Sequence, residues 1–180
     1  MTKPTVIAVA SDSQHNIVKP VRECIKLIAG WGVEGDAHAG KTVQHRYDKR
    51  RNPDAPNLRQ IHLMHAELFD QVAELGMEVK PGEMGENITT QGIDILNLPR
   101  GTHLKIGYAV IEITGLRNPC KYLNQIAPGL MKACSAKHED GSNFPQSGVM
   151  GVILADGEVK PGDEIHIITP EGPHHRLEPV

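Results

Sequence analysis

The residues with the clearest capacity for chemistry lie in the segment 113–126, which reads ITGLRNPCKYLNQI. Asn118 is a good helix N-cap, and Pro119 suits the first helical position because its missing N–H would be unpaired there anyway. We therefore expect Cys120 in the first turn of a short helix. Unpaired backbone N–H groups and the helix dipole favour an anion at such a position, so the spacing favours a thiolate.

Charged neighbours strengthen this interpretation. Arg117 and Lys121 lie within three residues of Cys120, and cations favour the thiolate, which is the nucleophilic and metal-binding form of cysteine. The alternative is a small buried apolar residue, which is the better expectation for an arbitrary cysteine. Because the cap, the proline and both cations agree, the segment predicts a functional thiol. Cys134 has no proline or cap beside it and Cys24 lies in an expected strand, so we expect both to serve packing.

A second unusual segment is 30–40, GWGVEGDAHAG, which contains four glycines. Such runs let backbone N–H groups converge on one point and form an anion-binding nest, to which Gly35 would belong. The segment lacks the GxGxxG and GxxxxGK[ST] patterns, so neither a dinucleotide fold nor a P-loop is indicated. Asp36 and His38 are potential metal ligands. A loop in which Asp36 caps a turn explains the same residues equally well.

Further polar residues accompany the expected strands. The segment 41–57 is polar and predicts a solvated loop, or else a flap over a pocket that holds an anion. Asn87 has both a donor and an acceptor, which suits the edge of a heterocycle. His62 and His65 have a ligand-like separation, but they straddle an expected strand–helix junction. We therefore expect structural histidines there rather than a zinc pair.

The elements that must position these residues are mostly short strands. The clearest helix is 65–76, in which Leu68, Val72 and Leu75 form an apolar stripe. A further helical turn is expected at 130–135. Apolar, β-branched runs bounded by turn residues predict strands at 5–10, 16–29, 58–64, 98–107, 109–114, 149–154 and 164–168.

Length and turn content indicate the architecture. A chain of 180 residues with 18 glycines and 13 prolines predicts one domain of short strands, spanning 1–180 with a polar, solvated C-terminal tail at 169–180. The sequence therefore predicts a mainly β fold, a closed or nearly closed β-barrel with a few peripheral helices.

Composition excludes several classes of partner. The net charge of -3 gives no reason to expect nucleic acid or an anionic membrane, and an aromatic content of 3% argues against base-stacking surfaces. The N-terminal apolar run is too short for a secretory signal or a membrane span. Three cysteines without such a signal indicate a reducing compartment, so we expect a cytoplasmic protein with free thiols.

Several motifs together resemble one known family. They are GVEGDAHAG, LRQIHLMHAEL, PGEMGENITTQGIDILNLPRGTHLKIG, ITGLRNPC and GVMGVILADGEVKPGDEI. In this order, over about 21–168, they resemble the MOSC domain, the module related to the C-terminal part of molybdenum cofactor sulfurases. The resemblance implies a β-barrel with peripheral helices, binding of molybdenum cofactor (molybdopterin), and sulfur or oxygen-atom chemistry. The characteristic cysteine of the family matches Cys120.

Given such a cofactor, residue chemistry and motif position predict roles for the other candidate residues. Cys120 would be a soft ligand of molybdenum, since a thiolate suits such a centre. The guanidinium groups of Arg59 and Arg117 would bind the phosphate of the cofactor. Glu86 and Asn87 would contact the pterin. The remaining predicted cofactor-binding residues belong to the glycine-rich and thiol segments, namely Gly35, Asp36, His38 and Asn118.

Two functions remain open from the sequence. The first is a molybdenum-cofactor enzyme that reduces N-hydroxylated or N-oxygenated small molecules, as relatives in the family do. The second is a sulfur carrier or transferase in which Cys120 holds a persulfide for the cofactor or another acceptor. A zinc-dependent or non-catalytic binding module using Asp36, His38, His62 and His65 is a weaker alternative.

The same resemblance indicates which cofactor to exclude and which partners to expect. The chain contains nothing similar to the pyridoxal-phosphate domain of the sulfurases or to a Cys-rich iron–sulfur module, so we expect no pyridoxal phosphate site. A small-molecule substrate is expected, with a separate reductase or cysteine desulfurase supplying electrons or sulfur. The oligomeric state stays open.

Overall fold

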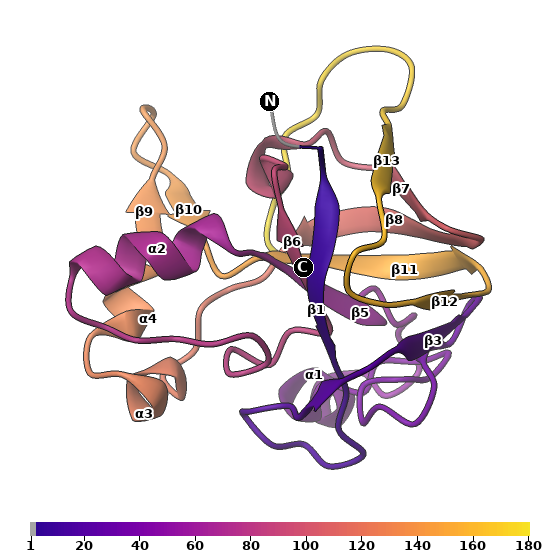
Figure 1. Ribbon diagram of the computed structural model, residues 1–180, viewed down its shortest axis with the longest axis horizontal. Coiled ribbons are helices and arrows are strands. Elements are labelled where there is room, and N and C mark those ends of the chain that lie inside the picture. Colours follow the sequence, from indigo (N-terminus) through magenta and orange to yellow (C-terminus); the bar gives the residue numbers. More distant parts are fainter. Residues whose placement is uncertain (1–2) are drawn as a thin grey trace.

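The computed structural model describes residues 3–180, and the fold is mainly β (Figure 1). The largest sheet has eight strands in the order β13-β7-β8-β11-β5-β6-β1-β2. These strands are β1 (Thr5–Ala10), β2 (Val21–Arg22), β5 (Ile61–His65), β6 (Ile88–Gln91), β7 (His103–Ile106), β8 (Ala109–Leu116), β11 (Val149–Ala155) and β13 (Ile165–Ile168). Two small sheets contain β3 (Ile25–Ile28), β4 (Gly32–Val33) and β12 (Gly157–Val159), and β9 (Ser135–Lys137) and β10 (Asn143–Pro145).

Helices are few and short. They are α1 (Arg46–Arg51), α2 (Glu67–Glu74), α3 (Leu123–Ile126), α4 (Leu130–Ala133) and the 3₁₀ helix η1 (Ile95–Asn97). The helices α2, α3 and α4 gather with the β9–β10 hairpin on one side of the molecule (Figure 1). Across residues 3–180, no helix has the length and apolar character needed to cross a bilayer.

The mainly β prediction is confirmed, but no sheet within residues 3–180 closes into a barrel. Strands β2 and β13 form opposite edges of the large sheet. An isolated bridge between Thr5 and Glu164 joins the start of β1 to the residue before β13, and Ile165 N donates to Pro4 O at 2.8 Å. Val6 N also donates to Asp163 O at 2.9 Å, and Gly162 N donates to Val6 O at 2.8 Å. Closure requires a continuous ladder between strands, and these contacts do not extend into one. Of the predicted closed or nearly closed barrel, the fully closed form is therefore wrong.

The strands β5 and β6 form a parallel pair within an otherwise antiparallel set of described pairings in this sheet. Helix α2 lies between them in the chain, so β5–α2–β6 is a βαβ unit. Parallel strands need such a crossover because a tight turn cannot return the chain to the same end of the sheet. The unit places His62 and Asn87 near the amino ends of the two strands and His65 and Gly92 at the carboxyl ends.

Two apolar clusters pack against β5. The larger is formed mainly by the sheets and includes Ile61, and the smaller is formed mainly by the helices and includes Met64. All five residues of β5 are buried because alternate side chains meet different clusters. Helix α2 contributes Leu68 and Val72 to the smaller cluster, as the apolar stripe predicts, whereas Leu75 is exposed.

The predicted strands are largely present, with two local differences. The segment 16–29 contains two strands, β2 and β3, and Cys24 between them is exposed rather than packed. The polar segment 41–57 contains α1, a helix without buried residues. A bridge between Thr42 and Pro56 holds the ends of this segment together. Because α1 has no apolar stripe, its sequence offers no periodicity from which a helix could be inferred.

The end of the C-terminal tail is anchored to the fold. Leu177 is buried in the larger cluster. Leu116 N donates to Glu178 O at 2.8 Å, and Val180 N donates to Leu116 O at 3.2 Å. The expectation of a solvated tail is wrong for these residues, because one leucine among polar residues is a weak sequence signal of burial. The tail lies beside the last residues of β8, immediately before Arg117.

Candidate functional site

Cys120 lies in an irregular stretch between β8 and α3. Helix α3 begins at Leu123 with Tyr122 as its N-cap residue, so the expected helix start at Asn118 and Pro119 is wrong. The carbonyl of Cys120 accepts a hydrogen bond from Leu123 N at 3.0 Å, which forms a turn ahead of the helix. Because α3 has only four residues, few peptide dipoles are aligned there, and the helix-dipole argument for the thiolate no longer applies.

The three cysteines differ in their exposure. Cys120 is partly exposed, and the three cysteines are free within the part of the chain that the structure describes. Cys134, by contrast, is fully buried, and burial raises the pKa of its thiol to about 11. Cys134 is therefore neutral at pH 7 and serves packing, as expected.

Arg117 is fixed through its backbone and has spare hydrogen-bonding capacity. Its N–H donates to Gly148 O at 3.0 Å, and its carbonyl accepts from Ser147 Oγ at 2.7 Å. The side-chain atom Nη1 is buried and has no hydrogen-bond partner among residues 3–180. A buried donor without an acceptor is costly. Arg117 is therefore suited to receive an anionic ligand.

Arg117 belongs to a cluster of neighbouring cations. Burial lowers the pKa of Arg59, Asp48 opposes this shift, and the positive charge of Arg117 adds to it. Arg59 Nη1 lies 3.5 Å from Asp48 Oδ2 on α1. Burial and the charge of Arg59 also lower the pKa of His45. The charges of the two predicted arginines are therefore close enough to interact, and their contact with a cofactor stays a prediction.

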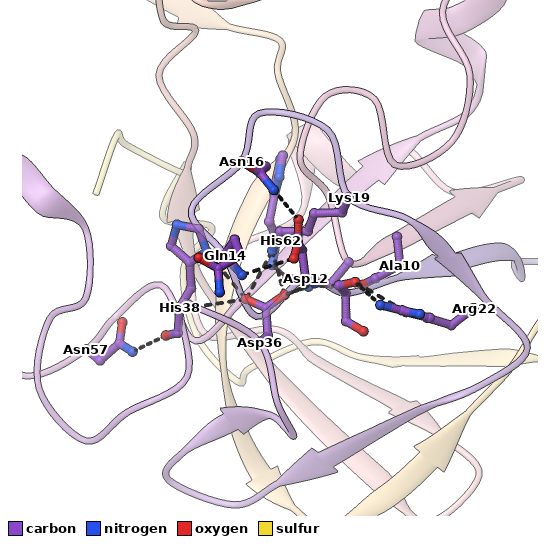
Figure 2. A network of polar contacts seen from close by, with 12 residues as sticks. Ala10, Asp12, Gln14, Asn16, Lys19, Arg22, Asp36, His38, Asn57 and His62 are labelled. Atoms are coloured by element: carbon purple, nitrogen blue, oxygen red, sulfur yellow. Dashed lines mark hydrogen bonds and ion pairs between the residues drawn. The ribbon is translucent and has the colours of Figure 1, made fainter.

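A buried ion pair between Lys19 and Asp36 lies in the polar network shown in Figure 2. The Lys19 Nζ atom is 2.8 Å from Asp36 Oδ2, and the two side chains are 2% and 1% exposed. Burial lowers the pKa of Lys19, and the charge of Asp36 opposes this shift. Burial alone would raise the pKa of Asp36, but hydrogen bonds from His38 and the charge of Lys19 bring it well below its usual value. Asp36 is therefore ionised at neutral pH, and the buried charge of Lys19 neutralises it.

The glycine-rich segment 30–40 folds around this carboxylate. Asp36 Oδ1 accepts a hydrogen bond from His38 N at 3.0 Å, and Oδ2 accepts one from Asp12 N at 3.3 Å. The turn-capping interpretation of Asp36 thus agrees with the structure. Gly35 has a φ of +74°, a conformation that favours glycine. The predicted contact of Gly35, Asp36 and His38 with a cofactor stays a prediction.

Asn87 is buried within the same network, and Glu86 is buried next to it in the chain. Asn87 Nδ2 donates to Asp36 Oδ2 at 3.0 Å and to a backbone carbonyl of β1, and its Oδ1 accepts from His62 N at 3.1 Å. Glu86 Oε1 accepts from Gly82 N at 2.7 Å, and burial raises the pKa of this carboxyl group. Both side chains support the surrounding backbone. Their direct contact with a pterin stays a prediction.

His62 has a structural position, as expected. Its Nε2 lies 2.8 Å from Ser147 O. Burial, followed by the charge of Arg117, lowers the pKa of His62 well below its usual value, so the ring is neutral. Across residues 3–180, no group of three or more His, Cys, Asp or Glu side chains is placed to hold a metal ion. The zinc alternative that used His62 and His65 therefore has no support.

Lys19 and Ser147 belong to this network but were missed by the sequence analysis. A lysine is rarely fully buried unless it is paired, and the partner of Lys19 is Asp36, 17 residues along the chain. Ser147 joins the network through Arg117 and His62, which lie on other strands or loops. Neither residue has a local pattern that reveals such contacts.

Two surface pockets have volumes of about 770 Å³ and 410 Å³. The larger is lined by the C-terminal tail and β8, and the smaller by the segments that follow β5 and β6. Neither is lined by Cys120, Arg59 or Arg117. The candidate site is therefore defined by a partly exposed cysteine and neighbouring cations rather than by one of these hollows.

The fold and these residues define a class of protein: a mainly β domain that presents a free cysteine shortly after an arginine with a spare donor. The MOSC domain model matches residues 34–166, and the chain belongs to the MOSC domain family, which is associated with molybdenum cofactor binding. The matched range contains Arg59, Arg117 and Cys120. No curated protein matches the sequence.

Solved structures share the fold. YuaD from Bacillus subtilis superposes with a TM-score of 0.75 at 19% identity, covering 94% of this chain and 98% of that one. YiiM from Geobacillus stearothermophilus gives a TM-score of 0.66 at 17% identity, covering 96% and 79% of the two chains. YiiM from Escherichia coli gives 0.62 at 18% identity, covering 95% and 73%.

The residues present fit the cofactor associated with the family. The buried Nη1 of Arg117, which has no acceptor within residues 3–180, matches the need of a phosphate for donors. The free, partly exposed thiol of Cys120 offers a soft ligand for molybdenum. Asn118 is exposed beside it.

Proposed function

We propose that this protein binds molybdenum cofactor with the Cys120 thiolate as a metal ligand and reduces N-hydroxylated or N-oxygenated small molecules. The observation that carries the proposal is a free, partly exposed thiol three residues after an arginine whose buried Nη1 lacks an acceptor among residues 3–180. Molybdenum supplies oxygen-atom chemistry when the cofactor is bound. A separate reductase supplies the electrons.

The chain contributes positioning and charge. Arg117 and Arg59 bind the phosphate, since two guanidinium groups in one cluster offer several donors to its oxygens. The Lys19–Asp36 pair holds the glycine-rich segment in place without adding net charge to the site. Asn87 connects this pair to the start of β5 by accepting a hydrogen bond from His62 N.

A second function rests on the same partly exposed cysteine. As a sulfur carrier, Cys120 would attack the outer sulfur of a donor persulfide, forming its own persulfide and releasing the thiol of the donor. The acceptor would be the cofactor or another molecule. Exposure to a cysteine desulfurase and free cysteine should then increase the mass of Cys120 by one sulfur atom. A mass that never changes, in protein that binds cofactor, would contradict this second function.

The main test is the metal content of protein purified from a host that makes molybdenum cofactor. The wild-type protein should contain close to one molybdenum per chain, with pterin fluorescence after oxidation, and Cys120→Ser should lose the metal. Cys24→Ser is the matched control, because Cys24 is an exposed cysteine elsewhere on the surface. Metal-free wild-type protein with a titratable Cys120 thiol would refute the proposal, as would full metal retention in Cys120→Ser.

A further inference from the structure

The smaller pocket takes no part in the function proposed for Cys120. It lies beyond the carboxyl ends of β5 and β6, with β10 and the following residue completing its wall, and has a volume of about 410 Å³. In open parallel α/β sheets, ligands bind beyond the carboxyl ends of the strands, in the crevice where the strand order reverses. The pocket lies at the corresponding end of the parallel β5–β6 pair.

Two buried polar atoms of the pocket residues have no hydrogen-bond partner in the described chain. His65 is 9% exposed, and its Nδ1 is one of them. Burial lowers the pKa of His65, opposed by Glu67 and Asp94, so the ring is neutral at pH 7 and one ring nitrogen accepts. Glu67 Oε1 accepts from Gly92 N at 2.7 Å, but its Oε2 is the second unpaired atom. Unmet acceptors of this kind are costly unless a ligand supplies donors.

The rest of the lining is acidic and apolar. Glu67 and Asp94 line the pocket, and its lining within residues 3–180 includes no lysine or arginine. Ile93 and Phe144 provide apolar surface. The Phe144 ring is supported by stacking on His138, with the ring centroids 4.4 Å apart. The pocket thus combines negative charge with an ordered apolar wall.

We infer that this pocket binds a small organic ammonium ion with an apolar body. The ammonium N–H groups donate to Glu67 Oε2 and His65 Nδ1, and the apolar body lies against Phe144 and Ile93. A bare metal ion is disfavoured because, across residues 3–180, the structure places no three metal-ligating side chains together. The inference does not depend on the function proposed for Cys120.

The test uses benzylamine, which is cationic at pH 7, and benzyl alcohol, its neutral counterpart of similar shape. Binding is followed by amide chemical shifts of the full chain, with the Gly92 N–H as reporter because it donates to Glu67. Benzylamine should bind saturably and shift the Gly92 amide resonance. Its affinity should be at least about tenfold higher than that of benzyl alcohol, because a charge-assisted hydrogen bond replaces a neutral one. Equal affinities, or shifts that map elsewhere, would overturn the inference.

Substitutions of the pocket carboxylates test where the ammonium group of the ligand binds. Glu67→Gln should weaken benzylamine binding about tenfold or more, whereas Glu74→Gln, the same change at the exposed far end of α2, should leave it unchanged. Asp94→Asn, a change at an exposed residue that keeps an oxygen to accept from Asn97, should weaken binding by about threefold through lost attraction. Cys120→Ser should bind as wild type does. Undiminished binding in Glu67→Gln, or in Asp94→Asn if Glu67→Gln does not fold, would refute the site.

Discussion

Both ends of the β5–β6 pair hold buried polar atoms without a hydrogen-bond partner in the described chain, but the two ends differ in the charge of those atoms. At the amino end, Asn87 has its side-chain amide fully bonded, and Lys19 and Asp36 neutralise one another. At the carboxyl end, His65 and Glu67 each retain a buried atom without a partner among residues 3–180. Polar groups that satisfy one another act as scaffold, whereas groups without a protein partner are available to a ligand or to ordered water.

At one end an unpaired atom is a cationic donor, and at the other end the unpaired atoms are acceptors. Beside the amino end, Arg117 Nη1 is a cationic donor without an acceptor in the described chain, which suits an anion. Glu86 Oε2 is also unpaired there, but burial raises the pKa of this carboxyl group and so favours its neutral form. At the carboxyl end the spare atoms are acceptors on Glu67 and His65. The βαβ unit thus has a region suited to anions at one end and a region suited to cations at the other.

The largest expected effect comes from breaking the ion pair at the amino end. Asp36→Leu leaves Lys19 buried without a partner, and such changes cost about 3–5 kcal/mol. Urea denaturation should show this loss. The double variant Lys19→Met, Asp36→Leu should recover much of it, because two apolar side chains replace two charges. A single variant as stable as wild type would mean that the pair does not hold this end together.

A smaller loss is expected where β5 approaches the loop before β11. Gly148 has a φ of +88°, and a Cβ there would clash with the backbone carbonyl oxygen of Leu63 and approach His62 Nε2. Gly148→Ala should therefore lower the free energy of unfolding by about 1–3 kcal/mol more than Gly141→Ala. The control shares the positive φ, at +80°, but its Cβ meets no atom within 4 Å. Equal losses would show that backbone strain alone matters at Gly148.

Substitutions at the two ends should weaken the binding of different ligands. Arg117→Gln should weaken binding of inorganic phosphate by about tenfold, since one charge-assisted contact is lost, and leave benzylamine binding unchanged. Glu67→Gln should do the reverse. Amide chemical-shift titrations of both variants with both probes provide the measurement. If each variant weakened both ligands alike, the two ends would not be independent sites.

The smallest effect is a pH dependence at the amino end. The pKa of His62 is lowered in the folded protein, so the unfolded chain binds a proton first as the pH falls below about 6.5. Stability contributed by neutral His62 is therefore lost with falling pH, by up to about 1.4 kcal/mol per pH unit. His62→Gln should flatten the slope of unfolding free energy between pH 6.5 and 5 by this amount. The slope above pH 7.5, where His62 is neutral in both states, should be the same in both proteins.

Local patterns predicted much of the fold because they depend on neighbouring residues. The run 5–10 is apolar and β-branched and forms β1, and the stripe of Leu68 and Val72 forms α2. The start of α3 was predicted wrongly from Asn118 and Pro119, because a cap and a proline show where a helix could begin and not where one does. Tertiary contacts of the following residues decide that boundary.

The sequence by itself determined the mainly β class, the membership of the MOSC domain family and the interest of Cys120, since these depend on composition, motif order and short-range spacing. The tertiary structure alone decided that Lys19 neutralises Asp36, that Arg59 and Arg117 share a cluster, and that Glu67 keeps an unpaired oxygen. Each of these facts concerns whether a polar atom finds a partner on another element. That outcome depends on how the chain packs, and no local pattern encodes it.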